Sequence, residues 1–286
     1  MTVSFKEKIL EYSESLNREF NFIQIGCNDG FMADPISQIV YEQRWQNGIF
    51  IDADNFYLER AMALYGNNCP DLNLRFVHAG IVTHEQSKRM GFNRKKFFSI
   101  NPHVLVPSRI PEDPNAEGDV FWAFGDKLVG LDTEGKDKSL VGKPADSPLD
   151  YLQGVGSFDY DFVLTHLKRV TEKQDLSGEV ARNIFGTDPL EHRKFIAMNI
   201  IPTATINDVF SVADFDTIDL LQTDMETWDV QVMLELEQFN RKPKFIHFEA
   251  PGTYGGVSED LKSVFEKCGY SLNFTSDSRD YLAELL

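Results

Sequence analysis

The sequence predicts an α/β fold in which helices cover both faces of a mostly parallel sheet. Short apolar runs alternate with amphipathic segments of helical period at both ends of the chain. This alternation is typical of parallel sheets, because parallel strands need a crossover that a helix usually provides. One apolar run, residues 22–25, ends directly in a loop that carries Gly26 and Gly30, and a helix start follows at Asp34-Pro35. A buried strand that feeds a glycine loop and then a helix is the first unit of such a sheet.

The glycine loop predicts a ligand site at the carboxyl end of its strand. A residue without Cβ adopts positive φ and allows close approach of a ligand, and cofactors bind at this end of parallel sheets. The spacing G-x-x-x-G differs from the dinucleotide fingerprint G-x-G-x-x-G. A structural strand-to-helix turn is therefore the alternative interpretation.

Composition limits the class of partner. The chain has 286 residues, 42% of them apolar, and carries a net charge of −17. A field of this sign repels phosphate backbones, so we expect no nucleic-acid partner. A neutral or cationic small molecule fits better, although the charge can equally serve solubility. Three widely spaced cysteines, an N-terminus unlike a signal peptide and no membrane-length apolar run predict a cytoplasmic protein with no membrane partner.

The first part of the chain contains three predicted strands. The predicted elements are a helix at 4–18, a strand at 22–25, a helix at 35–46 capped by Asp34, a strand at 48–51 and a strand at 72–77. Asp52 ends the second strand, where a carboxylate accepts both hydroxyls of a ribose; Asp52 or Asp54 can instead cap the next helix. Ala79 follows the third strand, where an adenine ring would rest.

The middle of the chain loses this regularity. Proline and glycine recur between 102 and 156, and a structureless loop of this length is uncommon within a domain. We therefore expect a large lid or insert at 83–200 between the third and fourth strands, with helices at 158–171 and 178–185. It would divide the main domain into segments 1–82 and 201–286.

Strand–helix alternation returns after residue 200. The predicted elements are a short helix at 205–210, a strand at 217–221, a helix at 227–239, a strand at 244–249, a helix at 258–267 ended by Gly269, and strands at 270–274 and 281–285. We expect the last two strands to form an antiparallel pair at the edge of the sheet.

Three segments together resemble the FkbM-type methyltransferases. They are the run from Ile23 to Gly30 (IQIGCNDG), the run from Phe50 to Asp54 (FIDAD), and the run from Ile218 to Glu226 (IDLLQTDME) followed by a helix. The order and spacing of these segments carry the resemblance, which covers about 20–82 and 200–286. Gln24 stands where the family usually has Asp, and Thr227 stands where it has glycine.

The resemblance implies a Rossmann-like fold and S-adenosylmethionine as the methyl donor. It places the donor against the first loop and the ends of the next two strands. The implied cofactor-binding residues are Gln24, Gly26, Asn28, Asp29, Gly30, Asp52 and Ala79. The implied reaction is methylation of a hydroxyl on a small molecule or sugar, and a homo-oligomer is possible.

Three side chains are candidates for catalysis. Asp224 ends the strand expected beside the first one and can act as general base toward a hydroxyl, while Glu226 can orient the acceptor. His247 ends the next strand, on one face with Glu249. The structural alternatives are a helix N-cap for Asp224, a dipole-favoured first-turn position for Glu226 and a buried hydrogen bond for His247. No metal is expected.

Two other functions remain open from the sequence. A nicotinamide-dependent oxidoreductase or epimerase uses a related sheet, but the third glycine and a Tyr-x-x-x-Lys pair are missing. A non-catalytic cofactor-binding module would be consistent with Gln24 and Thr227.

Overall fold

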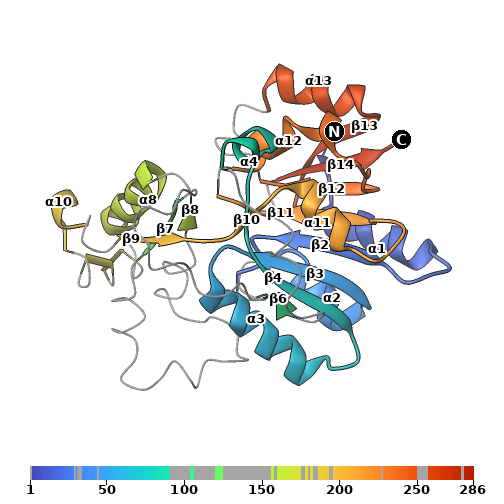
Figure 1. The fold of residues 1–286 in the computed structure, drawn as a ribbon, viewed down its shortest axis with the longest axis horizontal. Helices are drawn as coiled ribbons and strands as arrows, with labels where there is room; N and C mark the ends of the chain where they lie inside the picture. The colour runs from blue at the N-terminus through green and yellow to red at the C-terminus, as the bar shows by residue number, and fades with distance from the viewer. Residues whose placement is uncertain are drawn as a thin grey trace.

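The computed structural model describes most of the chain outside its middle. The described residues are 2–28, 30, 34–43, 45–90, 104–105, 120–124, 156–157, 160–174, 178–179, 181–182, 186–192, 196–226, 228–249, 257–277 and 280–286. Their fold is α/β, with a mostly parallel mixed sheet and helices on both faces, which confirms the predicted class (Figure 1).

The main sheet of the described residues has nine strands in the order β1-β13-β14-β12-β11-β2-β3-β4-β6. Their bounds are β1 Thr2–Val3, β2 Asn21–Ile25, β3 Asn47–Asp52, β4 Asn73–His78, β6 Val104–Leu105, β11 Leu220–Thr223, β12 Phe245–Phe248, β13 Tyr270–Thr275 and β14 Tyr281–Leu285. β2, which corresponds to the strand predicted at 22–25, is central, with β3 on one side and β11 on the other. The order therefore reverses direction at β2.

The end of the sheet differs from the prediction. β13 and β14 are antiparallel as expected, but β14 also pairs antiparallel with β12, so the reversed strand is internal. The two-residue strand β1 pairs with β13 and forms the outer edge instead. So short a strand has no periodicity of its own. It forms by pairing with Phe274 and Thr275, and the Ser276 N–H donates to the Val3 carbonyl at 2.8 Å beside this ladder.

The helices cover the two faces in two groups. α1 Phe5–Ser15, α2 Ser37–Gln43 and α3 Asn55–Asn68 pack on one face, and α11 Ile206–Val212, α12 Asp229–Met233 and α13 Glu259–Lys267 pack on the other (Figure 1). Alternation along β2 divides the core in the same way. Phe22 packs with the first group, whereas Ile23 and Ile25 pack with the second.

Local sequence explains most helix boundaries. Ser4 caps α1, Thr205 and Asp208 form a reciprocal capping box on α11, and Ser258 caps α13. Gly269, at φ 88°, follows the C-cap of α13 as predicted. The helix predicted at 227–239 is wrong: α12 ends at Met233 and a 3-10 turn, η3 (Leu236–Gln238), follows it.

The middle segment is described only in part. Strands β7 Val120–Phe124, β8 Gly156–Ser157 and β9 Ile196–Ile200 form a small antiparallel sheet with helix α8 Tyr160–Glu172 beside it. Helix α10 is Pro189–His192 and α4 is His84–Met90, while β5 Gly80–Ile81 pairs with β10 Thr203–Ala204. In α8, Val163, Leu167 and Val170 are buried. Most of the expected lid at 83–200, including much of the predicted helix at 178–185, lies outside the described residues.

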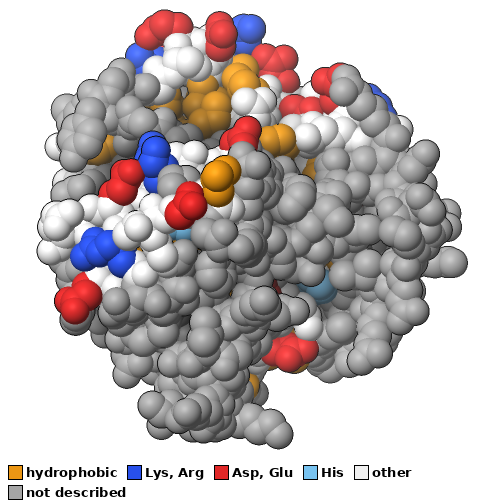
Figure 2. Space-filling view, turned by 90° about the vertical axis from the view of Figure 1, so that its left-hand side faces the viewer, with side chains coloured by type: hydrophobic (Ala, Val, Ile, Leu, Met, Phe, Trp, Pro, Cys, Tyr) orange, Lys and Arg blue, Asp and Glu red, His pale blue; other side chains and the backbone are white. Residues whose placement is uncertain are grey.

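Surface charge is mixed where it can be seen. Figure 2 shows acidic side chains interspersed with basic ones on the described part of one face, with no continuous basic stripe on that part. Within the described residues, no helix has the length and apolarity needed to cross a bilayer.

Candidate functional site

The candidate site lies where the strand order reverses, at the carboxyl ends of β2, β3 and β11. β2 continues toward α2 on one face, and β11 continues toward α12 on the other. Loops that leave neighbouring parallel strands toward opposite faces open the usual ligand position of an α/β sheet. All the predicted site residues that the structure describes lie at or next to these strand ends or the ends of β4 and β12. Asp29 lies outside the described residues.

Gly26 joins the two loops by direct backbone contact. Its φ is +73°, and a Cβ at this position would lie 1.7 Å from the Asp224 carbonyl oxygen. The Asp224 N–H donates to Ile25 O at 2.9 Å, and the Gly26 N–H donates to Ile51 O at 2.8 Å. The three strand ends are therefore locked together. Glycine is required here by backbone packing, and not by the ligand approach for which the sequence suggested it.

Gly30 also faces protein. Its φ is +71°, and a Cβ would meet the Tyr65 ring at 2.8 Å. The Tyr65 hydroxyl donates to the Gly30 carbonyl at 2.9 Å. This glycine fixes the end of the loop on α3.

Asp52 holds the first loop through its carboxylate. Oδ2 accepts the Asn28 N–H at 2.7 Å, and Oδ1 accepts the Asp54 N–H at 2.7 Å. Its own carbonyl accepts the Ala79 N–H at 2.8 Å. Burial raises the pKa of Asp52 to about 7, although both N–H bonds lower it. Each carboxylate oxygen keeps a further lone pair for a ligand hydroxyl.

Asn28 adopts a left-handed conformation with φ +50°. Non-glycine residues rarely occupy this region, and they tend to cluster at functional sites. The hydrogen bond to Asp52 holds the strained residue in place. The loop is thus shaped by one carboxylate and one asparagine in addition to its glycines.

Gln24 carries no carboxylate itself, but its side-chain amide is hydrogen-bonded to one. Its side chain is 2% exposed, and Nε2 donates to Asp34 Oδ2 at 2.6 Å. Asp34 Oδ1 also accepts the N–H groups of Ile36 and Ser37, so it caps the start of α2 as predicted. The sequence indicated only this capping role, because contact with Gln24 depends on how the loop folds back. Gln24 Oε1 is buried without a hydrogen-bond partner in the described structure.

The Asp224 side chain is accessible to solvent, although many protein atoms surround it. The residue is exposed to solvent, yet desolvation by the protein around it raises the pKa of its carboxyl group. The Glu226 backbone N–H makes a hydrogen bond to this carboxylate that partly opposes the rise. Asp224 does not cap the following helix, since the N-cap of α12 is Trp228. An accessible carboxylate with a raised pKa is a stronger base than an ordinary aspartate.

Glu226 and Glu249 face Asp224 from two strand ends. Burial, reinforced by the charges of Asp224 and Glu249, raises the pKa of Glu226 to about 8. Burial and the charge of Asp224 raise the pKa of Glu249 to about 7. Glu226 has φ +49° and lies outside the first turn of α12, so the helix-dipole interpretation does not hold. The three carboxyl groups beyond β11 and β12 therefore interact electrostatically with one another.

Asp229 was not among the predicted residues. It is fully buried at the start of α12, and its Oδ2 accepts the Met225 N–H at 2.8 Å. Burial raises its pKa, and the charge of Asp224 raises it further. In the sequence, Asp229 is an aspartate near the expected start of a helix, two residues after Thr227. An aspartate in that position is typical of helix capping rather than of a functional site. Asp229 fixes the loop that carries Asp224 and Glu226.

His247 lies on the face of the sheet that α1 covers. Its side chain is fully buried and stacks on Phe5, with ring centroids 4.0 Å apart. Nδ1 is hydrogen-bonded to Gln222 Oε1, and burial lowers the pKa of His247 to about 3. A neutral imidazole that is enclosed by protein cannot contact the substrate hydroxyl. We therefore remove His247 from the catalytic candidates. The partner of Nδ1 is therefore Gln222, and Nε2 lies 3.7 Å from Asp280 Oδ2.

The described residues contain no group of three or more His, Cys, Asp or Glu side chains arranged to hold a metal ion. In comparisons with known proteins, no family model, no curated protein and no solved structure matches this chain.

Proposed function

We propose that this chain is an S-adenosylmethionine-dependent methyltransferase of the FkbM type that methylates a hydroxyl on a small molecule or sugar. One observation carries the proposal. The loop that begins at Gly26 and the loop that presents Asp224 meet in backbone contact where the sheet reverses order. Asp52 lies at the neighbouring strand end and is bonded to the same first loop. These are the three segments in which the sequence resembles the family.

The residues present are suited to the methyl donor. S-adenosylmethionine supplies a methyl group on a sulfonium, and its cationic character favours a site bordered by carboxylates. Asp52 has acceptor capacity for the two ribose hydroxyls. The unpartnered Oε1 of Gln24 and the carboxylate of Asp34 provide acceptors for the ammonium group of the donor. Ala79, beside Asp52, borders the place for the adenine.

Asp224 is the proposed base. Its exposure lets an acceptor hydroxyl approach, and its raised pKa makes proton uptake from that hydroxyl more favourable. Glu226 lies beside it and orients the acceptor. Positioning supplies much of the rate of such a displacement, because donor and acceptor must align at about 3–3.5 Å.

Calorimetry with S-adenosylhomocysteine tests the donor site. We expect saturable binding by the wild type, and a loss of affinity of about tenfold or more in Asp52→Ala, since two hydrogen bonds to a charged group are removed. Glu59→Gln, on the exposed side of α3, is the charge-matched control and should bind as the wild type does. Absence of binding by folded wild-type protein would refute the proposal. Enhanced NADH fluorescence on mixing would favour the oxidoreductase instead.

Formation of S-adenosylhomocysteine with a panel of sugars and hydroxylated small molecules tests the reaction. Asp224→Asn keeps the shape of the side chain but removes the base, so turnover should fall by about 10²–10⁴-fold while donor affinity is retained. Equal turnover by Asp224→Asn and the wild type would exclude Asp224 as the base. Donor binding without transfer to any acceptor would favour the non-catalytic module.

A further inference from the structure

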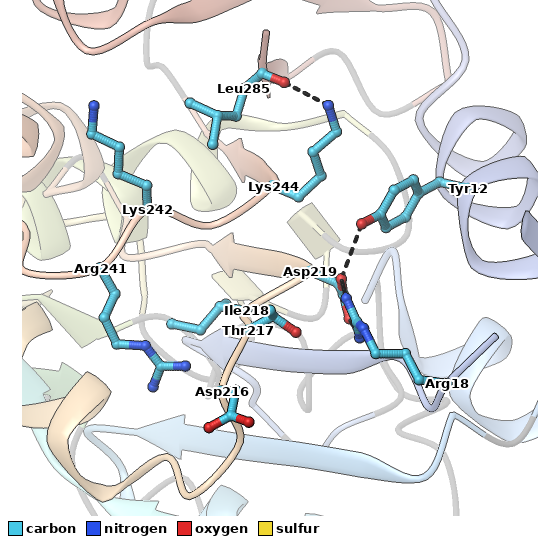
Figure 3. A pocket seen from close by; sticks show the side chains of 10 residues that line it. All are labelled: Tyr12, Arg18, Asp216, Thr217, Ile218, Asp219, Arg241, Lys242, Lys244 and Leu285. Atoms are coloured by element: carbon cyan, nitrogen blue, oxygen red, sulfur yellow. Dashed lines mark hydrogen bonds and ion pairs between the residues drawn. The ribbon is translucent and has the colours of Figure 1, made fainter. Parts of the chain in front are cut away.

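A second polar pocket lies at the opposite end of the sheet from Asp224. It is bordered by residues that precede β11 and β12, by the end of α1 and by the end of β14 (Figure 3). Its volume of about 300 Å³ is at the small end of the range for small-molecule sites. Asp219 and Asp224 flank β11 at its two ends, which places them about 16 Å apart in an extended strand. The pocket is therefore separate from the candidate site.

Positive charge predominates in this pocket. The charged side chains that line it are Arg18, Arg241, Lys242 and Lys244 against Asp216 and Asp219. The lining thus carries a local excess of two positive charges, in a chain whose net charge is −17. A local field opposite in sign to that of the whole molecule is unexpected for a surface that only maintains solubility.

One pair of these charges is already neutralised. Arg18 donates from both Nη atoms to Asp219, at 2.6 Å each, and the Tyr12 hydroxyl donates to the same carboxylate at 3.2 Å. Asp219 also accepts the Asn21 N–H at 2.9 Å. This bidentate pair forms one side of the pocket in Figure 3 and leaves little capacity for a ligand.

Arg241 and Lys242 are different, because they donate hydrogen bonds to backbone carbonyls, which are neutral acceptors. Arg241 Nη1 donates to the carbonyl oxygens of Phe210 and Ala213 at 3.2 and 3.3 Å. Lys242 Nζ donates to the Cys268 carbonyl at 2.8 Å. Backbone carbonyls orient a cation without cancelling its charge. Burial lowers the pKa of Arg241, and the charge of Asp216 opposes this effect. Both residues lie on the side of the pocket opposite Arg18, and their side chains point in different directions from neighbouring positions.

Lys244 completes the cationic border. Its Nζ lies 3.2 Å from Glu284 Oε1 and is also bonded to the Leu285 carbonyl. Glu284 is shared with Lys8 at 3.0 Å, so one carboxylate serves two ammonium groups. Lys244 therefore retains part of its charge for the pocket.

We propose that this pocket binds a small phosphate monoester. A phosphate monoester carries about −1.5 to −2 charges at neutral pH, which matches the excess of two positive charges. A guanidinium and ammonium groups are the side chains that bind phosphate oxygens best. Arg241, held in place by carbonyls, is the orienting group, and Lys242 and Lys244 supply further charge. This site is independent of the proposed methyltransferase function.

Calorimetry with inorganic phosphate and with glycerol 3-phosphate, at constant ionic strength, tests the proposal. We expect saturable binding of both by the full chain, and weakening of at least about fivefold in Lys242→Gln. Lys262→Gln on α13 removes the same charge outside the pocket and should change the affinity less than about twofold. Thr217→Asp, at an exposed lining position, adds repulsion without removing a cation and should also weaken binding by at least about fivefold.

The opposite results are equally clear. Absence of saturable heat up to about 20 mM of either compound would overturn the proposal. Equal weakening of phosphate binding in Lys242→Gln and Lys262→Gln would show that binding depends only on the net charge of the protein. That result would also overturn the proposal. Thr217→Asp keeps the test valid if Lys242→Gln does not fold. S-adenosylhomocysteine binding should be the same in all three variants, so failure of this site is distinguishable from failure of the donor site.

Discussion

At the scale of single residues, the least replaceable position of the site is a glycine. Gly26 lies so close to the Asp224 carbonyl that any side chain would push the two strand ends apart. Its positive φ adds a second cost for other residues. The geometry of the candidate site is therefore set by the absence of one carbon atom.

Gly26→Ala should destabilise the protein by about 3 kcal/mol or more, because the Cβ clashes with backbone atoms that cannot rotate away. Gly66→Ala is the matched control, since it lies in α3 with open space around its Cβ position. Alanine there should stabilise by about 0.5–1 kcal/mol through helix propensity. Urea unfolding measures both, and similar effects of the two substitutions would contradict the packing argument.

A second residue-scale prediction concerns His247. We expect His247→Ala to cost about 2–4 kcal/mol, because it removes a buried ring that stacks on Phe5 and bonds Gln222. The affinity of the folded protein for S-adenosylhomocysteine should not change. A large loss of turnover with an unchanged unfolding midpoint would restore His247 to the catalytic set.

At the scale of elements, one buried carboxylate ties α1 to the centre of the sheet. Asp219 is 1% exposed and is bonded by Arg18, by Tyr12 of α1 and by the first residue of β2. A buried carboxylate that loses its partner remains charged and uncompensated. The connection from α1 to β2 therefore depends on Arg18.

Arg18→Met should lower the free energy of unfolding by about 2–4 kcal/mol, somewhat less than for a fully buried pair because Arg18 is partly exposed. Lys8→Met breaks a more exposed ion pair with Glu284 and should cost less than about 1 kcal/mol. Chemical denaturation of both variants makes the comparison. An equally small effect at Arg18 would show that Asp219 is adequately satisfied by its other donors.

At the scale of the whole molecule, the carboxyl groups at the strand ends link stability to pH. Asp52 and Glu249 have pKa values of about 7, and Glu226 has one of about 8, all raised by burial. The folded state then binds more protons than the unfolded state between the ordinary and the raised values, so stability falls as pH rises. The lowered pKa of His247 makes stability rise with pH, but only below the ordinary histidine pKa of about 6.5. Above that pH, His247 adds no further change.

We therefore expect the unfolding temperature to fall by about a few degrees between pH 6.5 and 9. Glu226→Gln removes the group with the highest of these three pKa values and should flatten the slope. Calorimetric scans at matched ionic strength measure it. A flat or rising profile in the wild type would contradict the raised values.

The sequence predicted the parts of this protein that depend on local pattern. Continuous apolar runs indicated the central strands, and Gly26, Asp52 and Asp224 lie at strand ends as expected. The strand predicted at 217–221 is displaced, because β11 is Leu220–Thr223. The sequence prediction failed where partners distant in the chain decide the outcome. The edge strand Thr2–Val3 exists only because Phe274 and Thr275 pair with it. The helix after Asp229 ends early despite continuing apolar periodicity.

Only the tertiary structure decided what the polar residues contact. Composition and alternation determined an α/β chain with a parallel sheet, because burial of apolar faces is read from period and length alone. No such rule could show that Gln24 meets Asp34, that the charges of Glu226 and Glu249 interact with that of Asp224, or that His247 is enclosed against Phe5. Those contacts join residues from separate elements, and they form only when strand order and register bring the chain together.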